Sequence, residues 1–185
     1  ISLFNGKDLS GWHKVGGTGK FMVEKGVIRG HGIDIKGNTF LTTNKTYDNF
    51  TLELEARFDM DELTNSGIQF RSHAIDKRLR GYQFEFDNGA ATSNTGAVWD
   101  EYGTRGFISP FIPLPWIHKT DYDALMQKHG EAVKTFQTNT AKLLKKRDWN
   151  TIKIRCRDGR VQTWLNGIKQ ADFTDPEGAG FRSGV

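Results

Sequence analysis

Side chains that could hold or activate a polyhydroxylated ligand recur at every second position in three short stretches of the sequence. They are Glu53, Glu55 and Arg57 between positions 50 and 58, Gln69 and Arg71 between 66 and 72, and Gln83, Glu85 and Asp87 between 82 and 87. Guanidinium forks, amides and carboxylates match the hydrogen-bonding pattern of vicinal hydroxyls. Carboxylates can also transfer protons as general acids or bases. The residue types therefore favour a site for a sugar.

The period of two predicts that these stretches are β-strands, because successive strand side chains point to opposite faces. We expect the three strands to be neighbours, so that their polar side chains form one patch. The apolar partners should lie between two sheets, and they are Leu52, Leu54, Ile68, Phe70, Phe84, Phe86 and, from a later strand, Ile152 and Ile154. The alternative is an ordinary solvated sheet face, but such a face would carry more Lys and Thr.

The composition fits one β-rich domain of 185 residues. Twenty-one glycines against four prolines indicate many tight turns between short strands. The net charge of +4 is dispersed, with one basic cluster in 142–147, so we expect no nucleic-acid partner. No apolar run approaches the ~20 residues of a membrane helix. Cys156 alternates with apolar residues and should be a small core residue.

The remaining segments predict hairpins and one helical insertion. A hairpin is expected over 21–29, strands over 151–157 and 161–165, and a type I′ turn at Asn166-Gly167. Residues 77–81 should be a loop. Apolar residues recur every three or four positions in 119–146, which predicts a helix with Asp121 as N-cap.

Aromatic residues beside polar ones add possible sugar contacts. Trp99 precedes Asp100 and Glu101, and Trp116 follows an apolar segment rich in proline. Such rings either stack on sugars or cap a core. His73 lies close to Arg71, whereas the other histidines are scattered, so the sequence predicts no metal site.

Several ordered blocks of the sequence resemble the DUF1080 family, also called the 3-keto-disaccharide hydrolase domain. They are LFNGKDLSGW (3–12), NSGIQFRS (65–72), GYQFEFD (81–87), GAVWDE (96–101), DWNT (148–151) and TWLNG (163–167). The resemblance implies an all-β fold, a concanavalin A-like jelly-roll β-sandwich of two antiparallel sheets. It also implies a periplasmic or extracellular bacterial location and action on glycosides oxidised at C3.

The chain departs from the family pattern in two places. It carries a long insertion at 115–147, and it stops before the family's usual final segment, an apolar strand bearing Gln and His followed by an Arg-Asn pair. We expect residues 1–185 to form a single sandwich domain lacking that last strand, with the insertion as a lid or wall beside the site.

The implied reaction removes the C2 proton of a 3-keto-glycoside, expels the C1 substituent by β-elimination and then adds water. We assign Glu85 and Glu55 as base and acid, and Arg57 and Arg71 as stabilisers of the enolate. Substrate contacts are assigned to Glu53, Gln69, Gln83, Asp87, Trp99, Asp100, Glu101, Trp116 and His73. The partner is an oligosaccharide or glycoside, and the oligomeric state is open.

Two other functions are compatible with the sequence. A conventional glycoside hydrolase would use paired carboxylates on an unoxidised sugar, and a carbohydrate-binding module would hold sugar without cleaving it. No cofactor is expected, although a divalent cation is an open alternative as a stabiliser of the enolate.

Overall fold

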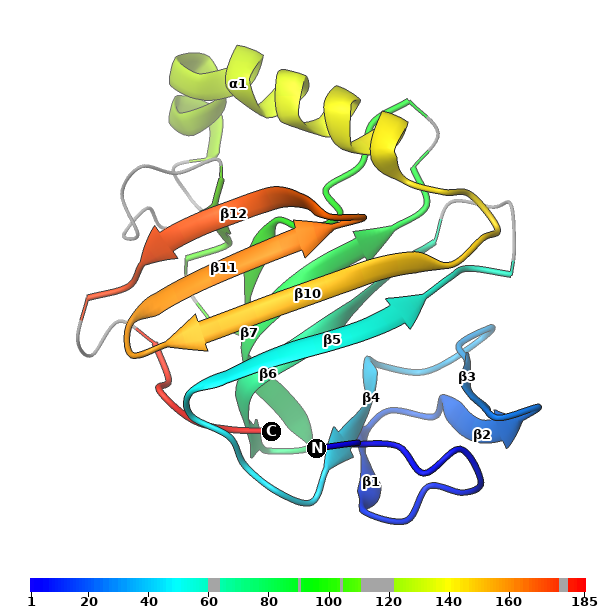
Figure 1. The fold of residues 1–185 in the computed structure, drawn as a ribbon. Helices are drawn as coiled ribbons and strands as arrows, with labels where there is room; N and C mark the ends of the chain where they lie inside the picture. Colours follow the sequence, from blue (N-terminus) through cyan, green and yellow to red (C-terminus); the bar gives the residue numbers. More distant parts are fainter. Residues whose placement is uncertain (60–63, 90, 104, 111–121, 177–179) are drawn as a thin grey trace.

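Two four-stranded antiparallel sheets pack face to face in the computed structural model (Figure 1). It describes residues 1–59, 64–89, 91–103, 105–110, 122–176 and 180–185, with side chains in the helix from residue 127 onward. One sheet has the order β6-β7-β8-β9 and the other β12-β11-β10-β5. Two small sheets, β1-β4 and β2-β3, lie at one end of the sandwich (Figure 1).

The elements of the described residues follow one another in chain order, with one helix among the strands. They are β1 (Trp12–Gly16), β2 (Lys20–Glu24), β3 (Val27–His31), β4 (Thr39–Thr43), β5 (Phe50–Ala56), β6 (Asn65–Ile75), β7 (Arg78–Asp87), β8 (Val98–Glu101), β9 (Phe107–Ser109), α1 (Tyr122–Leu143), β10 (Asn150–Arg157), β11 (Arg160–Leu165) and β12 (Ile168–Thr174). The predicted all-β jelly-roll sandwich with a helical insertion is confirmed.

The core lies between the two large sheets and is formed by the apolar positions of the alternating strands. All the apolar residues predicted for this layer belong to it, with Leu52, Leu54 and Ile68 at its partly buried margin. Cys156 is fully buried there, and burial raises the pKa of its thiol to about 12. The period-two pattern therefore predicted which face of each strand is apolar.

Turn residues set the hairpins. Asn166 and Gly167 both have positive φ, 49° and 83°, as a type I′ turn requires, and they join β11 to β12 as predicted. The predicted 21–29 hairpin is confirmed as β2 and β3. The predicted loop at 77–81 is wrong, because β7 begins at Arg78 and the turn is formed by Asp76 and Lys77, which have φ of 48° and 62°.

The expected pairing of the first two central strands is wrong. β5 pairs with β10, about a hundred residues later, while β6 pairs with β7 in the other sheet. The chain therefore crosses from one sheet to the other after β5. Consecutive strands are neighbours in most sheets, but a jelly roll alternates between its two sheets, and local periodicity carries no information about that crossing.

The helix α1 lies along one end of the sandwich (Figure 1). Val133 and Phe136 pack against Ala97 and Phe107, and Gln137 donates a hydrogen bond of 2.8 Å to Asn94. The predicted helix is thus confirmed, whereas Asp121 lies outside the described residues. That the helical insertion acts as a lid or wall beside the site stays a prediction. None of the described helical residues forms a segment apolar and long enough to cross a membrane.

Candidate functional site

Glu85 is a nearly buried carboxylate on the outer face of the β6-β7-β8-β9 sheet. Alternation along β7 turns Tyr82, Phe84 and Phe86 into the core, so Glu85 points to the other side. Its residue is only 5% exposed. Oε1 accepts a hydrogen bond of 2.7 Å from Nε2 of Gln83, and Oε2 accepts one of 3.1 Å from Nδ2 of Asn65. Each carboxylate oxygen is thus oriented by an amide.

A row of hydrogen bonds across β6 and β7 ends at this carboxylate. The Ser72 hydroxyl donates to Oε1 of Gln69 (2.7 Å), Nε2 of Gln69 donates to Oε1 of Gln83 (2.8 Å), and Gln83 donates to Glu85. Every amide in the row has its oxygen and nitrogen fixed by a neighbour. Such chains of hydrogen bonds polarise one another in a low-dielectric setting, so Glu85 is held in one orientation.

Gly67 makes room for this row. A Cβ added to Gly67 would lie 2.5 Å from Cγ and Cδ of Gln83, closer than real side chains approach. The Gln83 side chain therefore lies directly over the Gly67 backbone. The group that approaches the backbone of this glycine is thus a glutamine of the neighbouring strand.

Glu101 lies on the same face as Glu85. On β8, Trp99 is paired with Gln83 and Glu101 with Gly81, and paired residues of adjacent strands share a face. The Glu101 carboxylate is 7% exposed and accepts a hydrogen bond of 3.0 Å from Nδ2 of Asn38. The Trp99 ring packs edge-on against Phe107. Gln69, Gln83 and Trp99 lie side by side across the three strands, and Glu85 and Glu101 are on the same face, on either side of this row.

Both carboxylates hold protons more tightly than an exposed glutamate. Burial raises the pKa of Glu85, and the negative charges of Glu101 and Asp87 add to this, while the Gln83 and Asn65 hydrogen bonds oppose it. Burial also raises the pKa of Glu101, opposed by hydrogen bonds from Asn38 and Trp99. Two carboxyl groups on one face therefore have raised pKa values, and such groups exchange protons closer to neutral pH than exposed glutamates do.

Glu53, Glu55 and Arg57 do not belong to this face, which corrects the sequence prediction. Glu53 and Glu55 lie on β5 in the opposite sheet, and Arg57 directly follows this strand. Glu53 forms an ion pair of 2.7 Å with Lys153. The guanidinium of Arg57 pairs with Asp59 at 3.0 Å and lies over the Trp149 ring. Glu55 and Glu85 therefore lie on separate sheets with the core between them, and Glu55 cannot act with Glu85.

Arg71 is also absent from the site, because a β-bulge redirects it. Arg71 and Ser72 lie opposite the single residue Gly81, and Arg71 has φ of 49°. Its guanidinium is buried, donating to the carbonyls of Asp48 and Asp158 at 2.7 Å each. The alternation that placed Arg71 beside Gln69 is broken at this bulge, and Arg71 instead ties β6 to two turns of the opposite sheet.

His73, Asp87 and Asp100 have structural partners. The His73 ring contacts Phe181 and hydrogen-bonds the carbonyl of Ser183 at 2.9 Å. Asp87 accepts backbone N–H groups from Gly89 and Asn94 at 3.0 and 2.8 Å, and so shapes the loop after β7. Asp100 is paired with Tyr82 and points to the inner side of the sheet. Trp116 lies outside the described residues.

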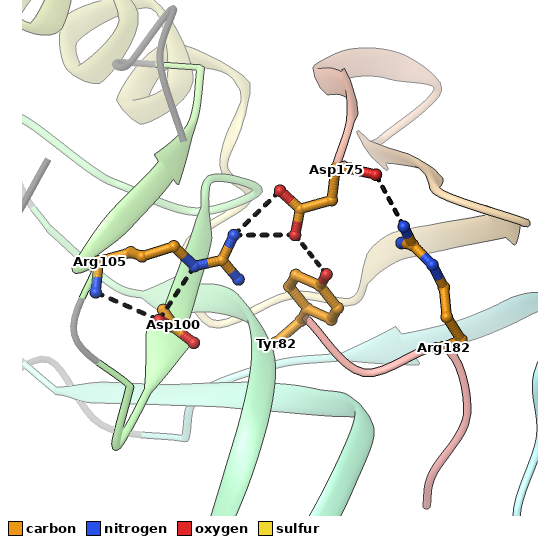
Figure 2. A network of polar contacts seen from close by, with 5 residues as sticks. All are labelled: Tyr82, Asp100, Arg105, Asp175 and Arg182. Atoms are coloured by element: carbon orange, nitrogen blue, oxygen red, sulfur yellow. Dashed lines mark hydrogen bonds and ion pairs between the residues drawn. The ribbon is translucent and has the colours of Figure 1, made fainter. Parts of the chain in front are cut away.

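Asp100 belongs to a buried ionic network beneath the site (Figure 2). Nε of Arg105 donates to Asp100 at 3.1 Å, and Nη1 of Arg105 donates to both carboxylate oxygens of Asp175 at 2.9 and 2.8 Å. The Tyr82 hydroxyl donates to the same Asp175, and Arg182 donates to its carbonyl oxygen. Burial and Asp175 raise the pKa of Tyr82. The network fixes β7 from the inner side.

Two contacts of the site were missed by the sequence predictions. Asn65 shares the parity of Gly67 and Gln69 on β6, so the alternation could have identified it. Asn38 precedes β4 in the N-terminal part and reaches Glu101 from 63 positions away, and no local pattern predicts that contact. Within the described part of the chain, no cluster of His, Cys, Asp and Glu could hold a metal ion.

Comparisons with known proteins agree with the geometry of the fold. A family model described as the 3-keto-alpha-glucoside-1,2-lyase-like domain matches residues 1–184. Among solved structures, a carbohydrate-binding module, CBM66 from Bacillus subtilis, is 17% identical with a TM-score of 0.58, covering 94% of this chain and 83% of its own. A protein from Parabacteroides distasonis proposed to be a glycosyl hydrolase is 23% identical with a TM-score of 0.54, covering 97% and 74%. No curated protein matches.

Proposed function

Because the chain belongs to the 3-keto-alpha-glucoside-1,2-lyase-like domain family, we propose that it cleaves 3-keto-glycosides at the face around Glu85. The observation that carries the proposal is Glu85 itself. It is a nearly buried carboxylate with a raised pKa, oriented through both oxygens and accompanied by a second such carboxylate, Glu101. A purely solvated sheet face would keep its carboxylates exposed and ionised.

The reaction requires a base before it requires an acid. A ketone at C3 acidifies the C2–H bond, so a carboxylate can take the C2 proton while the electron pair moves onto the C3 oxygen as an enolate. The enolate then collapses, the C1–O bond breaks, and the leaving oxygen takes up a proton. Water adds to the resulting enone to give the free 3-keto sugar. No oxocarbenium ion forms.

We assign the base to Glu85. A carboxylate is a stronger base when its pKa is raised, and proton transfer is most effective when that value approaches the working pH. Burial raises the pKa of Glu85, while the hydrogen bonds from Gln83 and Asn65 stabilise the ionised carboxylate and fix its orientation. We assign their amide groups as neutral donors to the enolate oxygen, in place of Arg57 and Arg71, which lie elsewhere.

Glu101 takes the role of acid that the sequence assigned to Glu55. Its raised pKa favours a held proton, which the leaving oxygen can accept. Trp99, on the same strand and the same face, offers a ring against which the apolar face of a sugar could pack. We propose that the substrate is an oligosaccharide or glycoside, and that the protein meets it in the periplasm or outside the cell.

The deciding experiment compares oxidised and unoxidised disaccharides with wild type, Glu85→Gln and the control Glu131→Gln. Glu131 is an exposed glutamate of α1. Glu85→Gln should reduce turnover of the 3-keto substrate by about 10²–10⁴-fold while retaining binding. Glu131→Gln should keep the turnover and the binding of wild type. Product formed in D₂O should carry deuterium at C2.

Other results would replace the proposal. Equal cleavage of the unoxidised sugar, without C2 deuterium, would indicate a conventional glycoside hydrolase. Saturable sugar binding with no product after long incubation would indicate a binding module.

A further inference from the structure

A second polar surface lies on the outer face of the β5-β10-β11-β12 sheet, on the other side of the core from Glu85. In Figure 1 no other described element crosses in front of this sheet. Side chains on this face alternate with core residues along each strand, so that Arg155, Gln162 and Trp164 are half-buried between buried neighbours. The face is independent of the proposed reaction.

Three arginines gather at one end of this face. Arg157 of β10 is paired directly with Arg160 of β11, and Arg155 precedes Arg157 by two positions on the same face. Directly opposed like charges destabilise a sheet. Arg160 pairs with Asp172 at 2.9 Å, whereas Arg155 and Arg157 form no ion pair with any residue whose side chain is described. Among the described residues, the charge of Arg160 is thus offset by Asp172, while those of Arg155 and Arg157 are not offset by an ion pair.

These arginines border a small pocket. Arg155, Arg157, Arg160 and Gln162 line a volume of about 130 Å³. Arg160 and Gln162 donate to the adjacent carboxylate of Asp172, so the guanidinium groups of Arg155 and Arg157 are the donors that the pocket offers to a ligand. Such a pocket fits one carboxylate or sulfate group, which guanidinium groups bind through paired hydrogen bonds.

A larger groove adjoins this pocket and shares Arg155 with it. The groove has a volume of about 780 Å³, within the usual range for small-molecule sites, and Glu53, Glu55, Thr151, Lys153 and Trp164 line it. Nζ of Lys153 lies 5.8 Å from the centre of the Trp164 ring and is held there by its ion pair with Glu53. The groove thus combines an aromatic ring with hydroxyl-binding groups of both signs.

We propose that this face binds an anionic oligosaccharide, with an acid group at the arginines and neighbouring sugar rings along Trp164. The charge distribution selects this occupant. A nucleic acid would bring phosphates along its whole length, and the two glutamates at the far end of the groove would repel them. A neutral glycan would leave Arg155 and Arg157 without a counter-charge. A sugar chain with one acid group at the arginines and neutral, hydroxylated rings along the groove satisfies both ends.

The test uses a tetrasaccharide of three neutral sugars and one terminal glucuronic acid, called the uronate tetramer, and measures its binding by isothermal titration calorimetry at physiological salt. Its carboxyl-reduced counterpart and a single-stranded oligonucleotide with four phosphates are the comparison ligands. The proteins are wild type, Arg155→Gln/Arg157→Gln, Trp164→Ala and the matched charge control Lys7→Gln/Lys20→Gln, whose lysines are exposed in the N-terminal part.

We expect saturable binding of the uronate tetramer, at least tenfold weaker binding of the reduced tetramer, and a tenfold loss in the double arginine variant. Trp164→Ala should weaken binding of both sugars, while the lysine control should bind both as wild type does. Unchanged uronate affinity in the double arginine variant, or equal affinity for the oligonucleotide, would overturn the proposal. So would the absence of saturable uronate binding. Far-ultraviolet circular dichroism checks that each variant is folded.

Discussion

The side-chain amide of Gln83 donates a hydrogen bond of 2.7 Å to Oε1 of Glu85, two positions further along β7. This bond stabilises the ionised carboxylate and lowers the pKa of Glu85 against the rise that burial causes. Gln83→Leu should therefore raise that pKa further. If Glu85 must be ionised to act, the acid limb of the kcat/KM profile should move to higher pH, and activity lost at neutral pH should return as the pH rises.

Gln127→Leu is the matched control for this variant, since Gln127 is exposed on α1. Its pH profile should coincide with that of wild type. A Gln83→Leu enzyme whose activity falls equally at every pH would show that the amide acts on the substrate and not on the titration of Glu85.

Gly67→Ala should reproduce the same shift in a protein that still contains Gln83. The added Cβ would lie 2.5 Å from Cγ and Cδ of Gln83, so the glutamine must leave its position over the strand. Gly32→Ala is the control, because its Cβ would meet only ordinary contact at 3.8 Å. An unchanged pH profile in Gly67→Ala would mean that Gln83 can yield without losing its bond to Glu85.

Local alternation predicted the sandwich, its core face and part of the site. Gln69, Gln83, Glu85, Trp99 and Glu101 share a face because each obeys the period of its own strand and because β6, β7 and β8 are consecutive neighbours. Where strands that are consecutive in the chain are also neighbours in the sheet, period-two alternation is enough to predict which side chains share a face.

Two features that periodicity cannot encode account for the wrong assignments. The chain crosses between the sheets after β5, so Glu55 and Arg57 lie in the other sheet. The bulge at Arg71 adds one residue to β6 and directs that side chain away from the face of Gln69. Glycine at position 81 is the only local sign of the bulge, because a Cβ there would lie 2.3 Å from Oγ of Ser72. The contact from Asn38 to Glu101 depends on tertiary packing and has no sequence signal.

The raised pKa of Glu85 also makes stability depend on pH. The folded protein holds this proton more tightly than the unfolded chain, whose ordinary value is 4.5. Between that value and the raised one the folded state carries more protons, so stability falls as pH rises through this window and the penalty remains above it. Glu85→Gln removes the titration. The difference in free energy of unfolding should therefore move in favour of the variant from pH 4 to pH 8.

Urea denaturation across that range measures this difference. The hydrogen bond that the amide cannot accept contributes an offset independent of pH, so the trend is the informative quantity. Parallel stability curves for wild type and variant would contradict a raised pKa in the folded state.

Arg105 should be the most costly single position of the buried network. Its side chain is 8% exposed and that of Asp175 is 0% exposed, and Arg105 is the cation placed between Asp175 and Asp100 (Figure 2). Arg105→Met leaves both carboxylates buried without a counter-charge, which costs about 3–5 kcal/mol of unfolding free energy. Tyr82→Phe removes one donor while Asp175 keeps its ion pair with Arg105, so this variant should cost about 1 kcal/mol.

The free energies of unfolding of both variants are measured by urea denaturation at pH 7. Arg105→Lys keeps the charge but loses the guanidinium fork, so its cost should fall between those of the other two variants. A smaller loss in Arg105→Met than in Tyr82→Phe would show that the carboxylates accept protons or water in place of the arginine, and that the network does not depend on its charge.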